Sequence, residues 1–471
     1  MSEQEITPIR KGSEQVLKIE SLAYGGRGVG RLGDFVVFVD RALPGQTVKV
    51  FLYRKRRGFG EGRIVEVLEE SPDAVTPPCA HAGLCGGCTL QHYHYEAQLE
   101  QKKLQVEDSL RRIGGWQSVS IQTVIGADPI FHYRNKMEFT ISPRRWIPRG
   151  ETAAKPAAFA LGLHIPGRFD KVLDIDDCFL QPEIGNRILN RVRTLALQHS
   201  LKPYDPKTHI GFLRHLMLRY GHRTGDVMVN LVTSYENLDL LLPVVEDLRQ
   251  HIPEITSIVN NINTRRGDTA YGEREILLHG DPFIREDLGH LTFQISANSF
   301  FQTNTLQAER LYAVVREKAR IRGTETVLDL YCGAGTIGLY LAREAREVIG
   351  VEVSPSAVED ARRNAELNGI TNARFLRANL DRPLGRLARE GSPELIIVDP
   401  PRVGLHRETI DSILRLAPDR IVYVSCNPTT LARDLQLFTA GGYQPGEPVV
   451  VDMFPHTAHI ETVVDLIRPR H

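Results

Sequence analysis

The chain has 471 residues, 42% of them hydrophobic and 25% charged, which is ordinary for a soluble globular protein of two to four domains. Its formal net charge of +0 excludes a general attraction to polyanions, so any nucleic-acid contact must come from local basic clusters. The polar first fifteen residues lack the apolar core of a signal peptide, and no run of about eighteen apolar residues occurs. We therefore expect a cytoplasmic protein that does not contact a membrane.

The N-terminal segment, residues 14–70, alternates short β-type runs with glycine-rich turns, which is typical of a small β-barrel. Four consecutive cations follow one of these runs, between Tyr53 and Phe59; they are Arg54, Lys55, Arg56 and Arg57. Such a mixture of cations and aromatic rings suits phosphates and stacked bases, although a solvated charged hairpin explains it about equally well. The arrangement resembles the TRAM domain, an RNA-binding barrel attached to RNA-modifying enzymes, and this resemblance favours RNA.

Three cysteines, Cys79, Cys85 and Cys88, fall within ten residues and are followed or preceded by glycines that let the backbone wrap closely around a bound group. Six cysteines are too few for a disulfide framework in so long a chain, so this crowding indicates a metal centre. Cys178 is the only cysteine outside this run and the two C-terminal motifs, which makes it the candidate fourth ligand. Three clustered thiolates and a distant fourth favour a 4Fe–4S cluster, with structural zinc as the alternative.

Residues 71–290 are predicted to form a central domain of mixed α/β structure, with strands over 136–142 and 227–233 and a helix over 238–251. Loops around 133–137 and 143–149 place cations beside aromatic rings. These loops are as consistent with an ordinary charged surface as with an RNA path. The predicted domains are therefore the barrel at 10–70, the central domain at 71–290 and a C-terminal domain at 291–471.

A nucleotide-binding signature begins the C-terminal third. Residues 326–331 are predicted to form a buried strand, followed by a tight turn at Gly333 and a helix over 336–344. Glu352 ends the next predicted strand, about twenty residues further on, where a carboxylate binds ribose hydroxyls. The glycine spacing also fits the dinucleotide fingerprint, so an NAD-dependent oxidoreductase is an alternative at this point.

Two further strand ends carry reactive groups. Asp399-Pro-Pro-Arg402 follows a predicted buried strand, and Cys426 follows the apolar run 421–424 and precedes an Asn-Pro turn. Ligands of open α/β sheets bind at the carboxyl ends of strands, and a helix beginning near residue 429 would favour the Cys426 thiolate. For a lone cysteine, a small buried side chain would be the simpler interpretation.

These motifs together resemble the RNA uracil-5 methyltransferase family. Asp399-Pro-Pro-Arg resembles the motif by which methyltransferases present a base beside S-adenosylmethionine, but amino methyltransferases carry an aromatic residue where Arg402 stands, which indicates chemistry at carbon. The other segments that carry the resemblance are 300–304, 329–335, 424–429 and 456–461. With the TRAM-like barrel and the four cysteines, the chain looks closest to the bacterial 23S rRNA (uracil-5-)-methyltransferase branch.

The resemblance implies a set of site residues. Gln302, Tyr331, Glu352 and Asp399 would contact S-adenosylmethionine, with Gly333 and Asn379 nearby. Cys426 would add to C6 of uracil, which makes C5 nucleophilic, and Glu461 would later remove the C5 proton. Thr336 departs from the asparagine of some members and is left out of the site. An ordinary surface glutamate is the alternative for Glu461.

The sequence therefore predicts a multidomain α/β protein with an OB-like TRAM barrel, a central α/β domain with an iron–sulfur cluster, and a Rossmann-like methyltransferase domain. The expected partner is RNA, with 23S rRNA favoured, and the expected state is a monomer. Alternatives within the family are a tRNA enzyme and an rRNA enzyme with two target sites. Outside it stand an RNA-binding iron–sulfur module without catalysis and, less favoured, a DNA cytosine methyltransferase.

Overall fold

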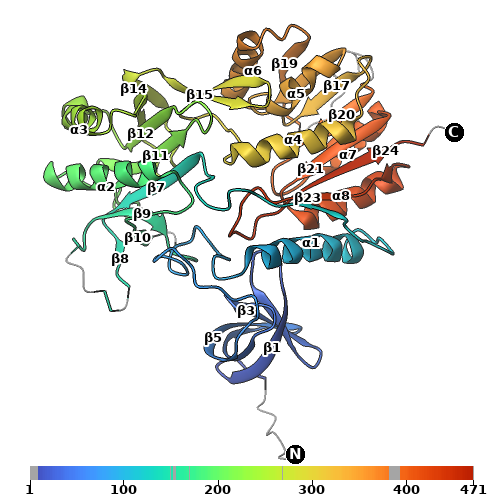
Figure 1. Cartoon of the computed structure of the whole chain (residues 1–471), viewed down its shortest axis with the longest axis horizontal. Helices are drawn as coiled ribbons and strands as arrows, with labels where there is room; N and C mark the ends of the chain where they lie inside the picture. The colour runs from blue at the N-terminus through green and yellow to red at the C-terminus, as the bar shows by residue number, and fades with distance from the viewer. Residues whose placement is uncertain are drawn as a thin grey trace, which may run out of the picture.

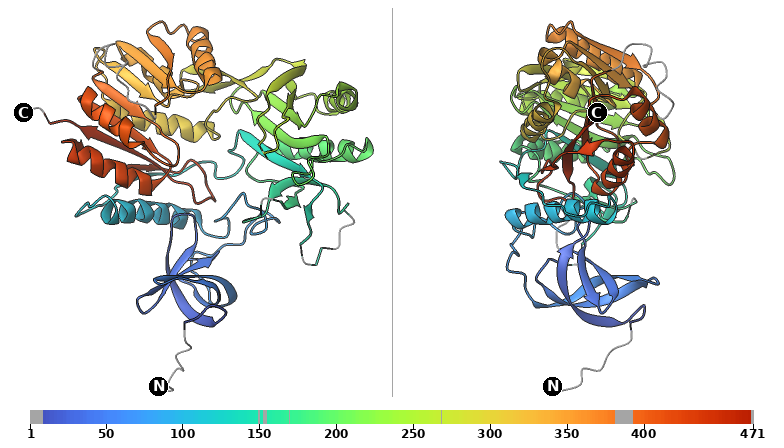
Figure 2. Two further views of the ribbon diagram at one scale, coloured as in Figure 1. Left: turned by 180° about the vertical axis from the view of Figure 1, so that it is seen from behind. Right: turned by 90° about the vertical axis from the view of Figure 1, so that its right-hand side faces the viewer.

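The computed structural model describes residues 9–148, 150–151, 155–168, 170–267, 269–380 and 393–469. Figure 1 shows the blue N-terminal barrel beneath helix α1 (Tyr95–Arg112), with the green central sheet on one side and the orange and red C-terminal layer on the other. The view from behind in Figure 2 shows the same arrangement of three parts. The predicted multidomain α/β architecture is confirmed in its barrel and its C-terminal domain.

The barrel is closed, with strand order β1-β2-β3-β5-β4 and β1 paired back onto β4. Its strands are β1 (Glu14–Leu22), β2 (Gly28–Leu32), β3 (Phe35–Asp40), β4 (Thr47–Lys55) and β5 (Phe59–Glu69). Buried and exposed residues alternate along β1, so that Leu17 and Ile19 pack inside with Val37 and Val50. A five-stranded closed barrel in this order is the OB-like barrel that the alternating sequence predicts.

The central domain is built on an eight-stranded sheet with order β14-β13-β12-β11-β7-β9-β10-β8. Its strands are β7 (Lys136–Ser142), β8 (Arg145–Trp146), β9 (Ala160–His164), β10 (Val172–Asp174), β11 (Leu213–Tyr220), β12 (Val227–Thr233), β13 (Ser257–Ile262) and β14 (Arg274–Gly280). Helices α2 (Glu183–Gln198) and α3 (Leu238–His251) pack on it through Ile188, Leu189, Val244 and Leu248. A hairpin of β15 (Phe283–Leu288) and β16 (Leu291–Ser296) leads into the C-terminal domain.

The C-terminal sheet runs β19-β18-β17-β20-β21-β24-β23-β6, with β22 paired to β24. Its strands are β17 (Thr326–Leu330), β18 (Glu347–Glu352), β19 (Ala373–Arg377), β20 (Leu395–Val398), β21 (Arg420–Ser425), β22 (Gln444–Pro445), β23 (Val449–Val451) and β24 (Glu461–Ile467). Strands β17 to β21 are parallel to their neighbours, whereas β24 is antiparallel to β21. The helices are α4 (Thr305–Ala319), α5 (Thr336–Leu341), η1 (Ala342–Glu344), α6 (Pro355–Leu367), α7 (Arg407–Leu416) and α8 (Pro428–Ala440).

Two elements within the range predicted for the central domain pack on the C-terminal layer instead. Strand β6 (Thr123–Ile125) pairs with β23, and α1 packs beside α8. A buried polar contact and apolar packing hold α1 there. Lys102 Nζ lies 2.6 Å from Asp452 Oδ1, and the Tyr95 hydroxyl donates to Asp452 Oδ2. Val106 and Leu110 of α1 are buried in the same apolar core as α8. The range 71–290 therefore supplies part of the catalytic layer as well as the central sheet.

Helix α1 has 18 residues, and many of them are charged or amide side chains, as its sequence YEAQLEQKKLQVEDSLRR shows. Across the described ranges, no helix is both long enough and apolar enough to cross a lipid bilayer.

Candidate active site

The predicted cofactor and catalytic residues lie along one edge of the C-terminal sheet, in spatial order. Asn379 follows β19, Glu352 ends β18, and Tyr331 and Gly333 follow β17. Asp399 follows β20 and Cys426 follows β21, while Glu461 begins the antiparallel strand β24. This edge is formed by the carboxyl ends of the parallel strands, where open α/β sheets bind their ligands. The structure therefore brings these residues from six neighbouring strands to the same edge of the sheet.

The turn after β17 brings backbone close to the Glu352 carboxylate. Tyr331 has φ 64°, Gly333 has φ 55° and Gly335 has φ 80°, so the chain doubles back sharply before α5 begins. The Gly333 N–H donates to Glu352 Oε2 at 3.2 Å, and Glu352 Oε1 accepts from the backbone N–H groups of Val353 and Ser354. Glu352 is thereby fixed at the strand end, as binding of ribose hydroxyls requires.

Two aspartates in the middle of the edge have raised pKa values. Burial raises the pKa of Asp399 to about 7. Burial, with smaller contributions from Asp399 and Glu352, raises the pKa of Asp329 to about 8, although the Gly338 N–H donates to it at 2.9 Å. A cationic ligand would be favoured beside these carboxyl groups, because it would stabilise their charged forms. Asp329 lies within the apolar run of β17, and its position in the sequence does not mark it as a site residue.

Cys426 lies in the turn between β21 and α8, as predicted. The side-chain oxygen of Asn427 accepts from the Thr429 N–H at 3.0 Å and caps α8, and Pro428 occupies its first turn. The Asn427 amide donates to the backbone oxygen of Arg402 at 2.9 Å. The cysteine turn and the Asp-Pro-Pro-Arg turn are therefore held together by one side chain.

The thiol of Cys426 is half-buried and protonated at neutral pH. Burial, followed by the charges of Glu461 and Asp399, raises its pKa to about 11, whereas Arg402 lowers it. The sequence predicts a helix N-terminus that favours the thiolate, and that helix is present as α8. Burial and the two carboxylates outweigh this helix, because a charge in a dry site is disfavoured more strongly than a helix terminus favours it.

Glu461 is placed next to Cys426 by the sheet register. Ser425 and Thr462 form the last pair of the antiparallel β21–β24 ladder, so Cys426 and Glu461 each lie one residue beyond it, and the charge of Glu461 is close enough to raise the pKa of Cys426. Glu461 is 6% exposed, and burial together with Asp399 raises its pKa well above the ordinary range of a glutamate, with Arg402 lowering it. Glu461 is thus a buried carboxyl group beside the candidate nucleophile, and the surface-glutamate alternative is wrong.

Gln302 reaches this domain from the segment between β16 and α4. Its backbone oxygen accepts from the Asn135 amide at 2.9 Å, and the Asn135 N–H donates to the oxygen of Thr303 at 2.8 Å. The Asn304 side chain caps α4 and donates to the backbone oxygen of Met453. The Gln302 segment is therefore fixed between the central domain and the loop that leads to Glu461.

A cation faces this edge from the Asp-Pro-Pro-Arg turn. Arg402 Nη2 lies 3.2 Å from His459 Nδ1. Burial, followed by the charge of Arg402, lowers the pKa of His459 to about 4, so this histidine is neutral and accepts from the guanidinium. The sequence predicts only that Arg402 stands where amino methyltransferases carry an aromatic residue. Its pairing with His459 could not be predicted, because it depends on a contact between segments far apart in the chain.

The four cysteines predicted as metal ligands lie around one small cavity, although the fourth is about ninety residues from the other three along the chain. Cys79, Cys85, Cys88 and Cys178 line it. Burial raises the pKa of Cys85 to about 11 and that of Cys88 to about 12, with further increases from the neighbouring thiols. Within the described ranges, no group of three or more His, Cys, Asp or Glu side chains is arranged to hold a metal ion. The iron–sulfur centre therefore stays a prediction.

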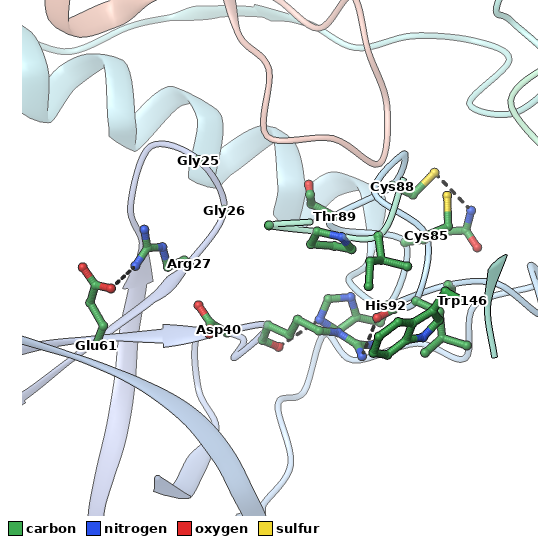
Figure 3. A pocket seen from close by; sticks show the side chains of 18 of the residues that line it. Gly25, Gly26, Arg27, Asp40, Glu61, Cys85, Cys88, Thr89, His92 and Trp146 are labelled. Atoms are coloured by element: carbon green, nitrogen blue, oxygen red, sulfur yellow. Dashed lines mark hydrogen bonds and ion pairs between the residues drawn. The ribbon is translucent and has the colours of Figure 1, made fainter. Parts of the chain in front are cut away.

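A larger cavity lies between the barrel and residues 79–92, here called the cysteine loop (Figure 3). Gly25, Gly26 and Arg27 of the β1–β2 turn line one side of it, and His92 and Trp146 line the other. The loop is joined to the barrel by a hydrogen bond of 3.0 Å between His92 Nε2 and the backbone oxygen of Arg41.

The same loop supports the segment that leads to Glu461. The N–H groups of Thr89 and Leu90 each donate to the backbone oxygen of His456 at 2.9 Å. Gln98 of α1 accepts from the His456 N–H at 3.0 Å, and the His456 ring stacks on Phe131 with centroids 4.3 Å apart. The barrel, the cysteine loop and the catalytic edge are therefore joined through contiguous contacts.

Parallel strands β17 to β21 with a glycine turn, a strand-end glutamate and a half-buried cysteine at their carboxyl ends are typical of a nucleotide-binding α/β domain, and the attached OB-like barrel is a fold that often binds nucleic acid. Comparison with known families extends this. The tRNA (uracil-5-)-methyltransferase family model matches residues 274–469, and the TRAM domain model matches residues 8–65.

Relatives match over nearly the whole chain. An uncharacterized RNA methyltransferase of Chlorobaculum tepidum is 46% identical over 471 residues, covering 98% of each chain, and one of Halalkalibacterium halodurans is 39% identical, covering 99% of each. The crystal structure of a Pyrococcus abyssi tRNA (uracil-54, C5)-methyltransferase in complex with S-adenosyl-L-homocysteine is 32% identical. The two structures superpose with a TM-score of 0.73, and the match covers 97% of this chain and 100% of the Pyrococcus abyssi chain. The chain belongs to the RNA (uracil-5-)-methyltransferase family and is an S-adenosylmethionine-dependent enzyme.

Proposed function

We propose that the enzyme methylates C5 of a specific uridine in 23S rRNA through a covalent bond between Cys426 and C6 of the base. The observation that supports this most strongly is that the β21–β24 ladder ends one residue short of Cys426 and Glu461, close enough for the charge of Glu461 to raise the pKa of the Cys426 thiol. A nucleophile and a base at adjacent positions are what addition and elimination at one base require. Because C5 and C6 lie inside a base stack, the uridine must be flipped out or drawn from a loop.

The first step is addition of the Cys426 thiolate to C6. The sulfur–carbon bond forms while the C5–C6 double bond opens, and its electron pair becomes available at C5. Arg402 favours this step, because its positive charge lowers the pKa of Cys426 against the effect of burial. Bound S-adenosylmethionine supplies an electrophilic methyl group, which C5 takes up.

Elimination is assigned to Glu461. After methylation, C5 carries both the methyl group and a proton, and the thiolate can leave only when that proton is removed. Glu461 removes it, the C5–C6 double bond re-forms, and the bond from Cys426 to C6 breaks. The raised pKa of Glu461 suits a strong base, provided that the carboxyl group has been ionised in the loaded site; Arg402 contributes to this by lowering the pKa.

The cofactor contacts are proposed from position along the sheet edge. Glu352 would accept from the ribose hydroxyls, and the exposed backbone at Gly333 allows close approach of the cofactor. Tyr331, Asn379, Gln302 and Asp399 are assigned to the other cofactor contacts from the family resemblance. The carboxyl group of Asp399, whose pKa is raised by burial, would be stabilised in its charged form by a cation.

We infer that the four-cysteine cavity holds a 4Fe–4S cluster, with zinc as the alternative. Four thiols line one cavity, which is a donor set that suits such a cluster. Cys79, Cys85, Cys88 and Cys178 would hold the cluster and brace the loop that contacts His456.

The substrate class is the finer part of the proposal. The barrel and the four cysteines support 23S rRNA, because together they resemble the bacterial rRNA branch. A tRNA is the second candidate, because the Pyrococcus abyssi enzyme, described as a tRNA uracil-54 methyltransferase, covers 97% of this chain. Matching over the whole length means that the barrel alone does not distinguish the two substrates.

The test is to map 5-methyluridine by mass spectrometry in rRNA and tRNA from a strain that lacks the gene. We expect loss of 5-methyluridine at one or two positions of 23S rRNA, restored by the wild-type enzyme and not by Cys426→Ala. Loss in tRNA with intact rRNA modification would establish the second candidate. An unchanged modification pattern in both RNAs would contradict the proposed function.

A further inference from the structure

The turn between β1 and β2 of the barrel reaches the catalytic edge of the C-terminal sheet. The hydroxyl of Tyr24 donates to the backbone oxygen of Cys426 at 3.2 Å. Gly25 and Gly26 continue the turn with φ of 97° and 84°, and a Cβ atom on Gly26 would lie 3.2 Å from the Cβ of Ala458. The turn is therefore closely packed against the segment that leads to Glu461, and Figure 3 shows both glycines at its tip.

The Tyr24 hydroxyl lies among the groups assigned to the reaction. It is within electrostatic reach of Cys426, Arg402 and Glu461, and burial together with Cys426 raises its pKa. The hydroxyl is therefore protonated and able to donate at neutral pH. Tyr24 is nevertheless 37% exposed, so the ring also faces the open side of the site.

In the described part of the chain, neither the β21–β24 ladder nor α8 supplies a hydrogen bond to the backbone oxygen of Cys426, so its donor comes from another segment. The β21–β24 ladder ends at Ser425, and the first helical hydrogen bond of α8 is accepted by Asn427. Cys426 and Asn427 form the link between β21 and α8, and the orientation of the Cys426 peptide affects where the thiol points. A fixed hydrogen bond to its oxygen would reduce the range of orientations of the nucleophile.

We propose that Tyr24 is a positioning residue by which the barrel completes the catalytic site, holding the Cys426 peptide so that the thiol faces C6 of the target base. The proposal rests on the proposed role of Cys426 as the nucleophile. It assigns the barrel a second task besides binding RNA, because a residue of the barrel then acts on the chemical step. The close contact of Gly26 with Ala458 keeps Tyr24 in reach of the site.

Tyr24→Phe tests this most sharply, because it removes the hydroxyl and keeps the ring. Single-turnover methyl transfer is measured at saturating RNA and S-adenosylmethionine, and the KM for RNA is measured separately. We expect the single-turnover rate to fall about two- to ten-fold, as expected for loss of one hydrogen bond, with the KM for RNA little changed. Tyr24→Ala should lower the rate further, and Tyr235→Phe, at an exposed tyrosine of the central domain that packs on Phe212, should match the wild type.

An unchanged single-turnover rate in Tyr24→Phe, or an increase in KM alone, would overturn the proposal and leave Tyr24 as an ordinary domain contact. A melting temperature of Tyr24→Phe equal to that of the wild type would show that a lower rate does not reflect misfolding. A separate measurement distinguishes failure of the proposed function: wild-type enzyme must form a covalent adduct at Cys426 with RNA containing 5-fluorouridine. Without that adduct the role of Cys426 fails, whereas with it the Tyr24 variants decide the positioning role.

Discussion

The side-chain amide of Asn427 lies 2.9 Å from the backbone oxygen of Arg402, and the Thr430 hydroxyl donates to the same oxygen at 3.4 Å. Asn427 also caps α8 through its side-chain oxygen. One residue therefore fixes the helix that follows Cys426 and the turn that carries Asp399 and Arg402. These two hydrogen bonds hold the Asp-Pro-Pro-Arg turn against the turn that carries Cys426.

Arg402 is expected to set the pH dependence of the reaction. Burial raises the pKa of Cys426 to about 11, so the thiolate fraction, and with it kcat/KM for RNA, should rise from neutral to alkaline pH. Arg402→Met removes the charge that lowers the pKa of both Cys426 and Glu461. The rising limb should then move to higher pH, and kcat/KM near neutral pH should fall roughly ten-fold.

Arg407→Met is the control for this change, because Arg407 is paired with Asp411 on the exposed surface of α7. Its pH profile should follow that of the wild type. A profile of Arg402→Met that superimposes on the wild type, at any overall rate, would remove the electrostatic role of Arg402.

The basic hairpin of the barrel is expected to bind phosphates unequally. Arg54 pairs with Glu61 at 3.0 Å and Lys55 donates to the backbone oxygen of Ile9, whereas Arg56 and Arg57 lie exposed in the β4–β5 turn. Replacing Arg56 and Arg57 with Gln should lower the slope of log K against log salt by about 0.7 per lost phosphate contact. Arg54→Gln should lower it less, since part of its charge is neutralised by Glu61. An unchanged slope in the double variant, measured by titration binding, would exclude the barrel from the RNA path.

The buried ion pair between Lys102 and Asp452 is expected to stabilise the catalytic layer. Both side chains are at most 2% exposed, so Lys102→Met leaves a buried carboxylate without its cation and should cost about 3–5 kcal/mol of unfolding free energy. Lys103→Met is the matched control, because its pair with Glu100 is partly exposed and is worth less than about 1 kcal/mol. Denaturant unfolding measures both, and equal stabilities of the two variants would show that the pair does not hold α1 to the sheet.

Much of the catalytic edge could be predicted from strand ends. Glu352, Asp399 and Cys426 each follow an apolar run, and the carboxyl ends of parallel strands meet at one edge. The neighbour relation between Cys426 and Glu461 could not be predicted in this way, because it depends on β24 entering the sheet antiparallel between β21 and β23. Only the family resemblance indicated Glu461.

Long-range contacts account for the other features of the structure that could not be predicted from the sequence. Tyr24 stands in a turn whose sequence predicts only chain reversal, and its contact with Cys426 joins residues 402 positions apart. The assignment of α1 to the C-terminal layer depends on the partner of one buried lysine, which local periodicity does not reveal. The raised pKa of Cys426 likewise reflects burial beside Glu461, whereas the sequence shows only the nearby helix terminus.

The cysteine cavity is expected to yield iron and sulfide in protein purified without oxygen. Cys178→Ser removes the distant ligand and should abolish the iron content, while Cys426→Ala should keep it, because Cys426 is not among the residues that line the cavity. Metal analysis with electron paramagnetic resonance after reduction measures both. Stoichiometric zinc without iron would contradict the cluster and establish the alternative metal.

Because Cys426 acts before methyl transfer and Glu461 acts after it, replacing each residue should stop the reaction at a different step. Cys426→Ala should prevent both adduct and methyl transfer while S-adenosylmethionine still binds, because the cofactor residues come from other strands. Glu461→Gln should still add the thiol and accept the methyl group, and should then stall before elimination. Asp399 is the rival carboxyl group, but its loss should reduce methyl transfer itself and give less labelled adduct.

The most direct measurement is peptide mass spectrometry of Glu461→Gln after incubation with RNA and methyl-labelled S-adenosylmethionine. We expect a denaturation-resistant complex in which Cys426 carries a methylated nucleotide, with little free product, and no complex in the double variant that also carries Cys426→Ala. Normal turnover by Glu461→Gln, or a nucleotide attached to Cys332 in place of Cys426, would contradict the covalent mechanism assigned to this pair.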